Sequence, residues 1–327
     1  GDWKTLLHEL WSLGVQDLSR FDFDDQKYMA QHLMVDVDQF DYLVIDEYQD
    51  TCAVEANLLQ RTCQSGRIIV VGDPDQCIYS FKGTTPDAMG NFARRYSARE
   101  LPLSICYRCS KAVVAEAATI VPRIEAWDNA PTGAVDEISE ADYRSRVVDG
   151  DFVLCRVTVD LVSSCLRFIA QGRPSYVLGK EIGDQLVSFV DEVATSDNQD
   201  ITEYFHAMQA HVQRRVEILT SMDRESSAAL LIDKAETITV LIGEAKRVGG
   251  LKKCIQNLFK KTGDGICHMT VHKSKGLETN GNVYLIAPEK IPHPRAKAQW
   301  MKEEEQRLLY VAITRAKQGF FRVRSEG

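Results

Sequence analysis

Two adjacent carboxylates close an apolar run in the sequence YLVIDEYQDT, which occupies residues 42–51. Asp46 and Glu47 follow three aliphatic side chains, and Asp50 comes soon after them. Acids at the end of a strand in a parallel sheet lie at the edge where ligands bind. There, one carboxylate can hold Mg²⁺ through water while its neighbour polarises an attacking water molecule. The pair predicts a site for nucleotide hydrolysis; the alternative is a strand that ends in an ordinary polar turn.

A second strand end carries polar and aromatic residues in VVGDPDQCIYSFKGT, residues 70–84. Gln76 supplies an amide that can orient a water molecule or contact a phosphate oxygen. Tyr79 and Phe81 stand beside Lys82, and aromatic rings next to a cation suit stacking on unpaired bases. The alternative for the two rings is a place in the hydrophobic core.

The composition is that of a globular protein. The chain has 327 residues, of which 44% are hydrophobic and 26% charged, and this length suffices for two domains with cores of their own. No apolar run approaches the roughly 18–20 residues that a membrane span needs, and the first residues have no signal-peptide layout. We therefore expect a cytoplasmic protein without a membrane partner, in the host cytoplasm if a phage encodes it.

Cysteine usage argues against a disulfide framework, because the nine cysteines are an odd number and lie scattered along the chain. Cys106 and Cys109 form one CxxC. A zinc site needs a second pair at suitable spacing, and the sequence holds none.

Basic residues gather in two runs although the net charge is −8. Neither the stretch 246–261 nor the stretch 290–302 contains an acid. Local basic patches bind phosphate even on an acidic protein. The alternative is that these runs are solvated helix faces.

Apolar runs of strand length alternate with helical patterns, which favours parallel sheets covered by helices. We expect helices within residues 1–35, and strands followed by helices at the ranges listed here: strands 42–46, 67–73, 101–108, 151–157 and PSYVLG, with helices 52–63, 86–97, SKAVVAEAATIV and 158–172. The pattern returns late in the chain with the strand NVYLIAP, a helix over 303–317 and the strand GFFRVRS.

Two stretches interrupt this alternation. Residues 126–142 are polar and marked by Gly and Pro, which indicates a linker or β-turn region. Residues 183–260 carry one helical pattern after another, with the ambiguous segment TITVLIG at 237–243. The expected organisation is a partial first domain at 1–100, a second domain in two parts at 101–182 and 261–327, and a helical insertion at 183–260.

The two polar strand ends together resemble motifs of the UvrD/Rep family of superfamily 1 helicases. DEYQDT is followed one β-α unit later by GDPDQCIYSFKG. Further segments resemble later motifs of that family in order: LSICYRCS, MTVHKSKGLE at 269–278 and EEEQRLLYVAITRAK at 303–317. FDFDDQ at 21–26 also resembles the acidic helix start that precedes the DE motif. The resemblance covers nearly the whole chain and implies two RecA-like domains, the first one incomplete.

The resemblance implies that the first domain holds the hydrolytic residues. Asp46 would hold Mg²⁺, Glu47 would be the catalytic base, and Gln76 would sense the γ-phosphate of ATP. The residues implied to contact single-stranded DNA or a single-strand/duplex junction are Tyr79, Phe81 and Lys82 here and Thr270, His272 and Lys273 in the second domain.

The same resemblance places the rest of the nucleotide site on the second domain. Tyr107 would stack on the adenine, and Arg108 would contact the γ-phosphate. Glu278 would bind the ribose beside Gly276. Arg315 would act as an arginine finger, a role that raises rates by several orders of magnitude in enzymes of this chemistry.

The sequence departs from the family pattern at three places. Phe81 stands where the family usually has Trp, and Lys82 stands where it usually has Arg, so stacking on DNA is expected to be weaker. The helical insertion is shorter than in the large bacterial members. Finally, GxxxxGK[ST], the loop whose backbone amides and lysine cradle phosphates, occurs nowhere in the 327 residues.

We therefore expect the C-terminal two-thirds of an ATP-dependent DNA helicase that moves 3′→5′ on single strands, in a chain that lacks ATPase activity by itself. The alternative is a relative that binds single-stranded nucleic acid or a partner protein without hydrolysis. The helical insertion is a candidate surface for a protein partner. A role in DNA repair is typical of the family, but the sequence leaves repair, replication and phage biology open.

Overall fold

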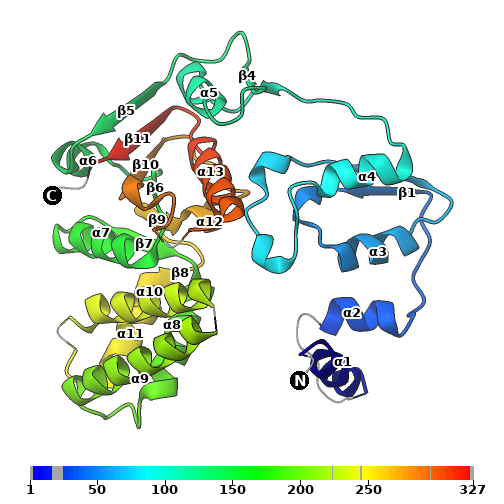
Figure 1. Ribbon diagram of the computed structural model, residues 1–327. Helices are drawn as coiled ribbons and strands as arrows, with labels where there is room; N and C mark the ends of the chain where they lie inside the picture. The colour runs from blue at the N-terminus through cyan, green and yellow to red at the C-terminus, as the bar shows by residue number, and fades with distance from the viewer. Residues whose placement is uncertain (1–2, 17–24, 223, 244, 295, 325–327) are drawn as a thin grey trace. The chain divides into compact units, whose positions relative to one another are not determined.

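The computed structural model describes residues 3–16, 25–222, 224–243, 245–294 and 296–324. The chain divides into two compact units, Gly1–Leu101 and Pro102–Gly327, and each unit is described by itself (Figure 1). The expected helix start at 21–24 lies outside the described residues.

The first unit is built on a two-stranded parallel sheet. β1 (Tyr42–Ile45) pairs with β2 (Arg67–Val70). The other elements are α1 (Trp3–Gly14), α2 (Asp25–His32), η1 (Tyr48–Asp50), α3 (Ala53–Arg61), η2 (Pro74–Gln76), η3 (Ser80–Lys82) and α4 (Ala88–Tyr96). An ion pair of 2.7 Å between Lys27 and Glu55 ties α2 to α3.

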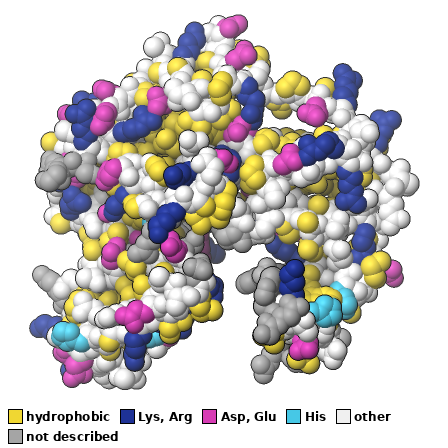
Figure 2. Space-filling view, in the orientation of Figure 1, with side chains coloured by type: hydrophobic (Ala, Val, Ile, Leu, Met, Phe, Trp, Pro, Cys, Tyr) yellow, Lys and Arg dark blue, Asp and Glu magenta, His cyan; other side chains and the backbone are white. Residues whose placement is uncertain are grey.

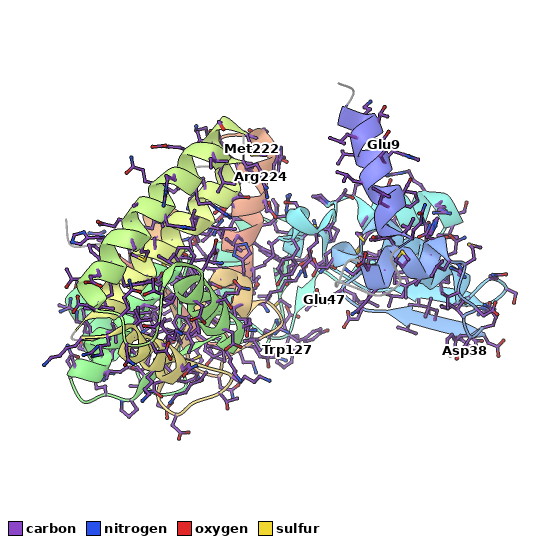
Figure 3. The ribbon with its side chains drawn as sticks, turned by 90° about the horizontal axis from the view of Figure 1, so that it is seen from below. Glu9, Asp38, Glu47, Trp127, Met222 and Arg224 are labelled. Carbon is purple, nitrogen blue, oxygen red and sulfur yellow. The ribbon has the colours of Figure 1, made fainter. Side chains whose placement is uncertain are left out.

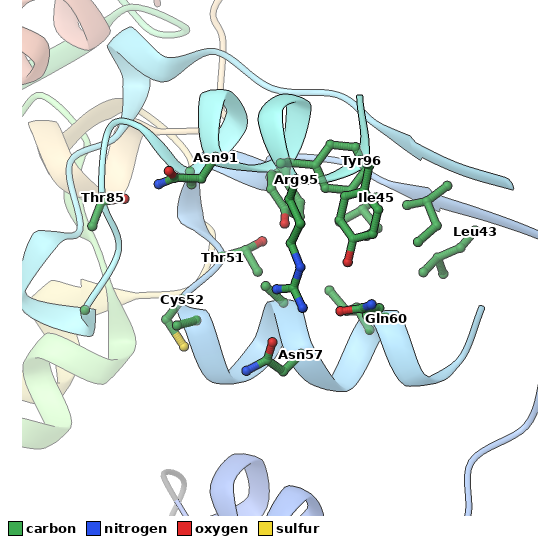
Figure 4. Close-up of a pocket in the computed structure, with 18 residues that line it drawn as sticks. Leu43, Ile45, Thr51, Cys52, Asn57, Gln60, Thr85, Asn91, Arg95 and Tyr96 are labelled. Carbon is green, nitrogen blue, oxygen red and sulfur yellow. The ribbon is translucent and has the colours of Figure 1, made fainter. Parts of the chain in front are cut away.

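The two faces of this sheet differ in exposure, because successive side chains of a strand point to opposite faces. Tyr42, Val44 and Ile69 are exposed on the outer face. Leu43, Ile45 and Ile68 face inward and line a cavity of about 370 Å³. Arg95 and Tyr96 of α4 and residues of α3 complete its wall (Figure 4).

The second unit contains a seven-stranded sheet whose neighbours are all parallel, in the order β5-β11-β10-β6-β9-β7-β8. The strands are β5 (Ala134–Ile138), β6 (Phe152–Cys155), β7 (Ser175–Leu178), β8 (Phe259–Lys260), β9 (Ile266–Thr270), β10 (Asn282–Ile286) and β11 (Gly319–Val323). The central strands β6, β9 and β10 are almost wholly buried, as expected of a parallel sheet covered on both faces.

Helices and a small additional sheet surround this core (Figure 1). β3 (Ile105–Cys106) and β4 (Glu125–Ala126) form a separate two-stranded parallel sheet. The helical elements are α5 (Lys111–Ala118), α6 (Glu140–Arg146), α7 (Thr158–Ala170), α12 (Val271–Ser274), η4 (Pro288–Lys290) and α13 (Gln299–Ile313).

Four helices lie between β7 and β8 in the chain: α8 (Lys180–Val193), α9 (Ile201–Ser221), α10 (Glu225–Ile242) and α11 (Val248–Leu258). They share an apolar core that continues into α7 through Val162 and Cys165. Asp233 of α10 accepts hydrogen bonds from the backbone amides of Thr158 (3.0 Å) and Val159 (3.2 Å), and so caps the first turn of α7. These helices are therefore fastened to the sheet domain by packing and by a cap.

The segment after β3 is fastened to the C-terminal part of the chain. The Ser110 amide donates to Lys317 O at 2.9 Å, and the Ser110 hydroxyl donates to Gln318 O at 2.9 Å. Gly133 has a φ of +66°, and a Cβ there would lie 1.9 Å from the Ser110 hydroxyl. Only glycine fits this close approach. We call the contacts of Cys109 and Ser110 with residues 314–318 the clasp.

The structure confirms the predicted α/β class with parallel sheets, and the helical pattern over 183–260 corresponds to α8–α11. The expectation of a linker or β-turn region at 126–142 holds only for residues 127–133, which contain a turn, because β5 and α6 occupy 134–138 and 140–142. β5 is an edge strand, and its polar, exposed positions masked the strand pattern. TITVLIG lies in α10 up to Ile242, and the strand expected at 101–108 is reduced to Ile105–Cys106.

The basic runs of the sequence are partly neutralised by acids from other segments. Lys252 pairs with Asp191 and Asp197, and Lys297 pairs with Glu225 at 3.0 Å. On the face shown in Figure 2, basic and acidic side chains alternate over the surface of this unit. Among the residues described, no helix is long and apolar enough to cross a membrane.

A buried polar chain runs through the core of the second unit. The Tyr143 hydroxyl hydrogen-bonds to the Ser164 hydroxyl at 2.9 Å, and Ser164 lies 3.3 Å from His268 Nε2. His268 is fully buried in β9, and burial lowers its pKa to about 4. The imidazole is therefore neutral in the folded protein at neutral pH.

His268 should make the stability of this unit sensitive to acid. Below pH 6.5 His268 binds a proton in the unfolded chain but stays neutral in the folded chain. The free energy of unfolding therefore decreases as the pH falls from about 6.5 towards 4. The full loss from this group is about 3 kcal/mol. Urea unfolding across this pH range should show a shallower decline for His268→Gln. The control, exposed His206→Gln, should keep the wild-type slope; equal slopes in all three proteins would contradict the prediction.

Candidate functional site

The two predicted catalytic acids lie at the carboxyl end of β1, as parallel-sheet geometry requires. Asp46 and Glu47 are both exposed, and the Glu47 amide donates to Asp46 Oδ1 at 2.8 Å. Glu47, labelled in Figure 3, has a left-handed backbone with φ of 52°. This conformation is energetically unfavourable for residues other than glycine. Contacts with the surrounding structure must therefore stabilise it.

A buried amide supplies that support. Gln49 is fully buried, and its Nε2 donates to Glu47 Oε2 at 2.5 Å. Its Oε1 accepts from the Asp73 amide at 3.0 Å, and Asp73 Oδ2 accepts from Gln76 Nε2 at 2.9 Å. Glu47 and Gln76, predicted from separate motifs, therefore belong to one hydrogen-bonded chain that joins the ends of β1 and β2.

Sequence reasoning missed Gln49 and Asp73. Both stand inside the quoted motifs, but their spacing gives no sign that one is buried and the other is an acceptor. The available signal was Gly72, which precedes Asp73. A Cβ on Gly72 would lie 2.2 Å from Gln49 Oε1, so the glycine leaves room for this amide.

The predicted DNA-contacting residues of the first unit lie close to the acids. The Lys82 ammonium sits 4.4 Å from the centre of the Tyr79 ring, a cation–π contact. Burial raises the pKa of Tyr79, and the charges of Asp50 and Glu47 raise it further. The phenol thus stays protonated beside the carboxylates of Asp50 and Glu47. The side chain of Phe81 lies outside the described part of the structure.

The predicted nucleotide-contacting residues of the second unit also gather. Arg108 Nε lies 2.7 Å from Glu278, and Lys317 Nζ lies 2.6 Å from the other oxygen of that carboxylate. The hydrogen bond from Lys317 lowers the pKa of Glu278, and the positive charges around it add to the effect. Tyr107 is 70% exposed, and its ring lies 5.9 Å from that of Trp127, which is labelled in Figure 3.

Arg315 is held inside its own unit. Its side chain is buried, and it donates to Val311 O and Leu277 O, each at 3.0 Å. Leu277 follows Gly276, which has a φ of +78° and would have no atom within 4 Å of an added Cβ. Contacts with Leu277 and Glu278 therefore bring Arg315 and Arg108 to the same loop.

Thr270, His272 and Lys273 lie together at the end of β9. The Thr270 hydroxyl accepts from the Lys273 amide at 3.2 Å and caps α12. Lys273 forms an ion pair with Glu181 of α8. Burial and the charge of Arg156 lower the pKa of His272 to about 3. The neutral imidazole can form hydrogen bonds with a phosphate, but it adds no positive charge.

The residue set fits a magnesium ion held through water. Asp46 offers an exposed carboxylate beside a second one, and hard oxygen ligands are those that Mg²⁺ prefers. Within the described ranges, no group of three or more His, Cys, Asp or Glu residues is arranged to hold a metal by itself. A metal here would need further ligands, such as water and phosphate oxygens.

Comparison with known families matches both ends of the chain. Residues 2–97 match the UvrD/REP helicase N-terminal domain, and residues 265–321 match the UvrD-like helicase C-terminal domain. Over these residues the chain is similar to helicases of the UvrD/Rep type. The first match contains the acid pair and Gln76, and the second contains the loop with Glu278 and Arg315.

Individual relatives agree with this assignment. The F-box DNA helicase protein 1 of Schizosaccharomyces pombe is 27% identical over 85% of the chain and 33% of its own length. The putative ATP-dependent DNA helicase YjcD of Bacillus subtilis is 24% identical over 96% of the chain and 56% of its length. The ATP-dependent DNA helicase UvrD2 of Mycobacterium tuberculosis is 23% identical over 86% and 47%, respectively. The chain thus spans about a third to a half of these relatives.

Gly72→Ala should weaken the first unit through Gln49. The new Cβ displaces the buried amide, so the Asp73 amide loses its acceptor, at a cost of about 1–3 kcal/mol. Urea unfolding with hydrogen exchange at Asp73 measures both effects. Gly14→Ala, where a Cβ meets nothing within 4 Å, is the matched control and should not destabilise the unit, because alanine favours a helix more than glycine does. Equal behaviour of the two variants would show that Gln49 is not fixed by Gly72.

Proposed function

We propose that this chain carries most of the motor of an ATP-dependent DNA helicase that translocates 3′→5′ on single-stranded DNA, with Mg²⁺ as the metal cofactor. The observation that carries the proposal is the hydrogen-bonded chain from Glu47 through Gln49 and Asp73 to Gln76. A base and a phosphate-sensing amide linked in this way respond to the same bound nucleotide.

In this proposal the first unit performs the hydrolytic chemistry. Asp46 would hold Mg²⁺, which would supply positive charge against the phosphates. Glu47 takes a proton from the attacking water. Gln49 orients the Glu47 carboxylate by donating to one of its oxygens, and Gln76 contacts the γ-phosphate. Hydrolysis thereby changes a contact that reaches the DNA-binding segment through residues 76–82.

The second unit supplies the base-binding and cationic groups. Tyr107 stacks on the adenine, and Glu278 binds the ribose beside Gly276. Arg108 contacts the γ-phosphate, so nucleotide binding must exchange its ion pair with Glu278. Arg315 must likewise leave the carbonyl oxygens of Val311 and Leu277 to reach a phosphate. The arginine-finger role therefore requires a rearrangement of the Arg315 side chain.

The DNA-contacting residues are proposed to lie on both units. On the first unit, Tyr79 and Phe81 stack on bases while Lys82 contacts a phosphate. On the second unit, the corresponding residues are Thr270, His272 and Lys273. The helical segment 183–260 is proposed as an insertion that meets a protein partner or a duplex junction. Its α9–α10 end exposes Ile218 and Met222 (Figure 3).

The phosphate loop is the missing component. No GxxxxGK[ST] occurs within the 327 residues, so we propose that a longer polypeptide supplies it and that this chain alone does not turn over ATP. The same absence favours a second candidate: a relative that binds single-stranded nucleic acid or a partner without hydrolysis.

ATP turnover with and without single-stranded DNA separates the two candidates. The longer natural polypeptide should show turnover that DNA stimulates, and Glu47→Gln should reduce it by about 10²–10⁴-fold because a general base is lost. The 327-residue chain should show none. Turnover by this chain that disappears in Glu47→Gln would contradict the need for the loop. DNA binding without turnover by the longer protein would favour the non-hydrolysing relative.

Direction of movement needs its own assay. The longer polypeptide should unwind a partial duplex with a 3′ single-stranded tail and leave one with a 5′ tail intact. Equal unwinding of both substrates, or a preference for the 5′ tail, would overturn the proposed 3′→5′ polarity.

Single-strand binding should depend on the Tyr79 ring. Tyr79→Ala should weaken binding of a fluorescent oligothymidine by about 1–3 kcal/mol, since one stacked base is lost. Tyr79→Phe keeps the ring and should bind nearly as well as wild type. Lys82→Ala should lower the salt dependence of binding by about 0.7 in log–log slope, whereas exposed Lys111→Ala on α5 should not. Loss of binding in Tyr79→Phe equal to that in Tyr79→Ala would exclude stacking.

A further inference from the structure

The bend between β3 and α5 brings two cysteines together. Cys106 ends β3, and residues 107–109 form the bend. Three consecutive bend residues make the chain change direction between the two cysteines, and a disulfide requires Cα atoms about 4.4–6.8 Å apart. Both cysteines are free thiols, and the Cys106 sulfur interacts with the side chain and the backbone amide of Cys109.

The two thiols differ in their access to solvent. Cys106 is half-buried, whereas Cys109 is 1% exposed. Cys109 Sγ also donates to Thr314 O at 3.6 Å, as part of the clasp. An external reagent therefore meets Cys106, and Cys109 can react only with a group already attached to Cys106.

The charges around the pair support the same order of reaction. The hydrogen bond from Cys109 lowers the pKa of Cys106 to about 6, with backbone amides and Arg108 contributing, although burial opposes this. The interaction with Cys106, together with burial, raises the pKa of Cys109. Once Cys106 loses its negative charge by forming a mixed disulfide, the largest cause of the raised Cys109 pKa disappears.

We propose that Cys106 and Cys109 are a thiol modification site that a small disulfide such as glutathione disulfide converts into an intrachain disulfide. The Cys106 thiolate attacks one glutathione sulfur, forms a mixed disulfide and releases one glutathione thiolate. Cys109 gives up its proton and attacks the Cys106 sulfur, which releases the second glutathione. Two protein thiols are oxidised, and one glutathione disulfide is reduced to two thiols.

The disulfide would close a ring around Tyr107 and Arg108. It would also remove the thiol hydrogen that Cys109 donates to Thr314 O, next to Arg315. Because Arg108 pairs with Glu278, oxidation changes the loop proposed to bind the nucleotide. This consequence rests on the proposed function, whereas formation of the disulfide does not.

The test is a thiol titration of the 327-residue chain in glutathione buffers of graded ratio. Samples are quenched in acid, unfolded in denaturant at neutral pH with excess N-ethylmaleimide so that every remaining thiol is alkylated, weighed intact and then mapped by peptide. The oxidised chain should carry two fewer adducts than the nine cysteines of the reduced chain, and the missing adducts should map to Cys106 and Cys109. The half-buried thiols Cys52 and Cys254 serve as internal controls and should remain alkylated.

Variants identify the attacking thiol. Cys109→Ser should stop at one glutathione on Cys106, whereas Cys106→Ser should leave Cys109 unmodified. Cys109→Ala repeats the first test if serine disturbs the buried site, and circular dichroism verifies the fold of each variant.

The pH dependence of the reaction rate provides a second test. At pH 6 Cys106 should react with glutathione disulfide about tenfold or more faster than Cys254, because its larger thiolate fraction outweighs the lower nucleophilicity of that thiolate. The rate at Cys106 should level off above about pH 7.

Three outcomes would overturn the proposal. They are retention of all adducts at Cys106 and Cys109 across the titration, oxidation of Cys52 or Cys254 at the same glutathione ratio, and first attack at Cys109. Since the readout is mass, none of these outcomes depends on nucleotide binding. A disulfide that forms in a longer protein without ATPase activity would leave this inference standing and overturn the proposed function alone.

Discussion

The clasp is the constraint on which the second unit depends. Contacts of Cys109 and Ser110 with residues 314–318 join segments that are about 200 positions apart in sequence. Gly133 packs against Ser110 where no other residue fits, and β5 then continues beside β11. Close to the clasp, Arg108 pairs with Glu278 and Arg315 donates to the carbonyl oxygen of the neighbouring Leu277. The mutual geometry of these three side chains therefore depends on contacts between distant segments rather than on one loop.

The first unit links distant segments through one buried side chain, whereas the clasp combines a backbone hydrogen bond with those of the Ser110 hydroxyl and the Cys109 thiol. Gln49 links the end of β1 to the backbone of Asp73 after β2. Its side-chain amide donates a hydrogen bond to Glu47 and accepts one from the Asp73 amide. A buried amide with both ends satisfied is rigid, because breaking either bond leaves an unpaired polar group away from water. The hydrogen bond from Gln49 helps to stabilise the left-handed backbone of Glu47.

The sequence predicted the features that depend on local pattern. It failed where contacts between distant segments determine the secondary structure or the burial of a residue. β1, β2 and β10 followed from apolar runs with polar ends. Motif resemblance singled out Arg108, Glu278 and Arg315, which the structure brings to one loop, while their roles stay a prediction. Residues 134–142 were misinterpreted, since an edge strand such as β5 lacks a hydrophobic pattern. TITVLIG contains β-branched residues that favour strands, but packing of α10 against its neighbours overrides that preference. The burial of Gln49 and Arg315 depends on partners that no spacing rule reveals.

The outer face of the two-stranded sheet has a practical consequence for handling this protein. Tyr42, Val44 and Ile69 are exposed there side by side, and contiguous apolar surface on a sheet promotes association between chains. Apparent affinity for an oligonucleotide would then vary with protein concentration as copies gather through this face. Light scattering across the working range, together with dilute protein and moderate salt, is needed before any binding isotherm is interpreted as that of a monomer.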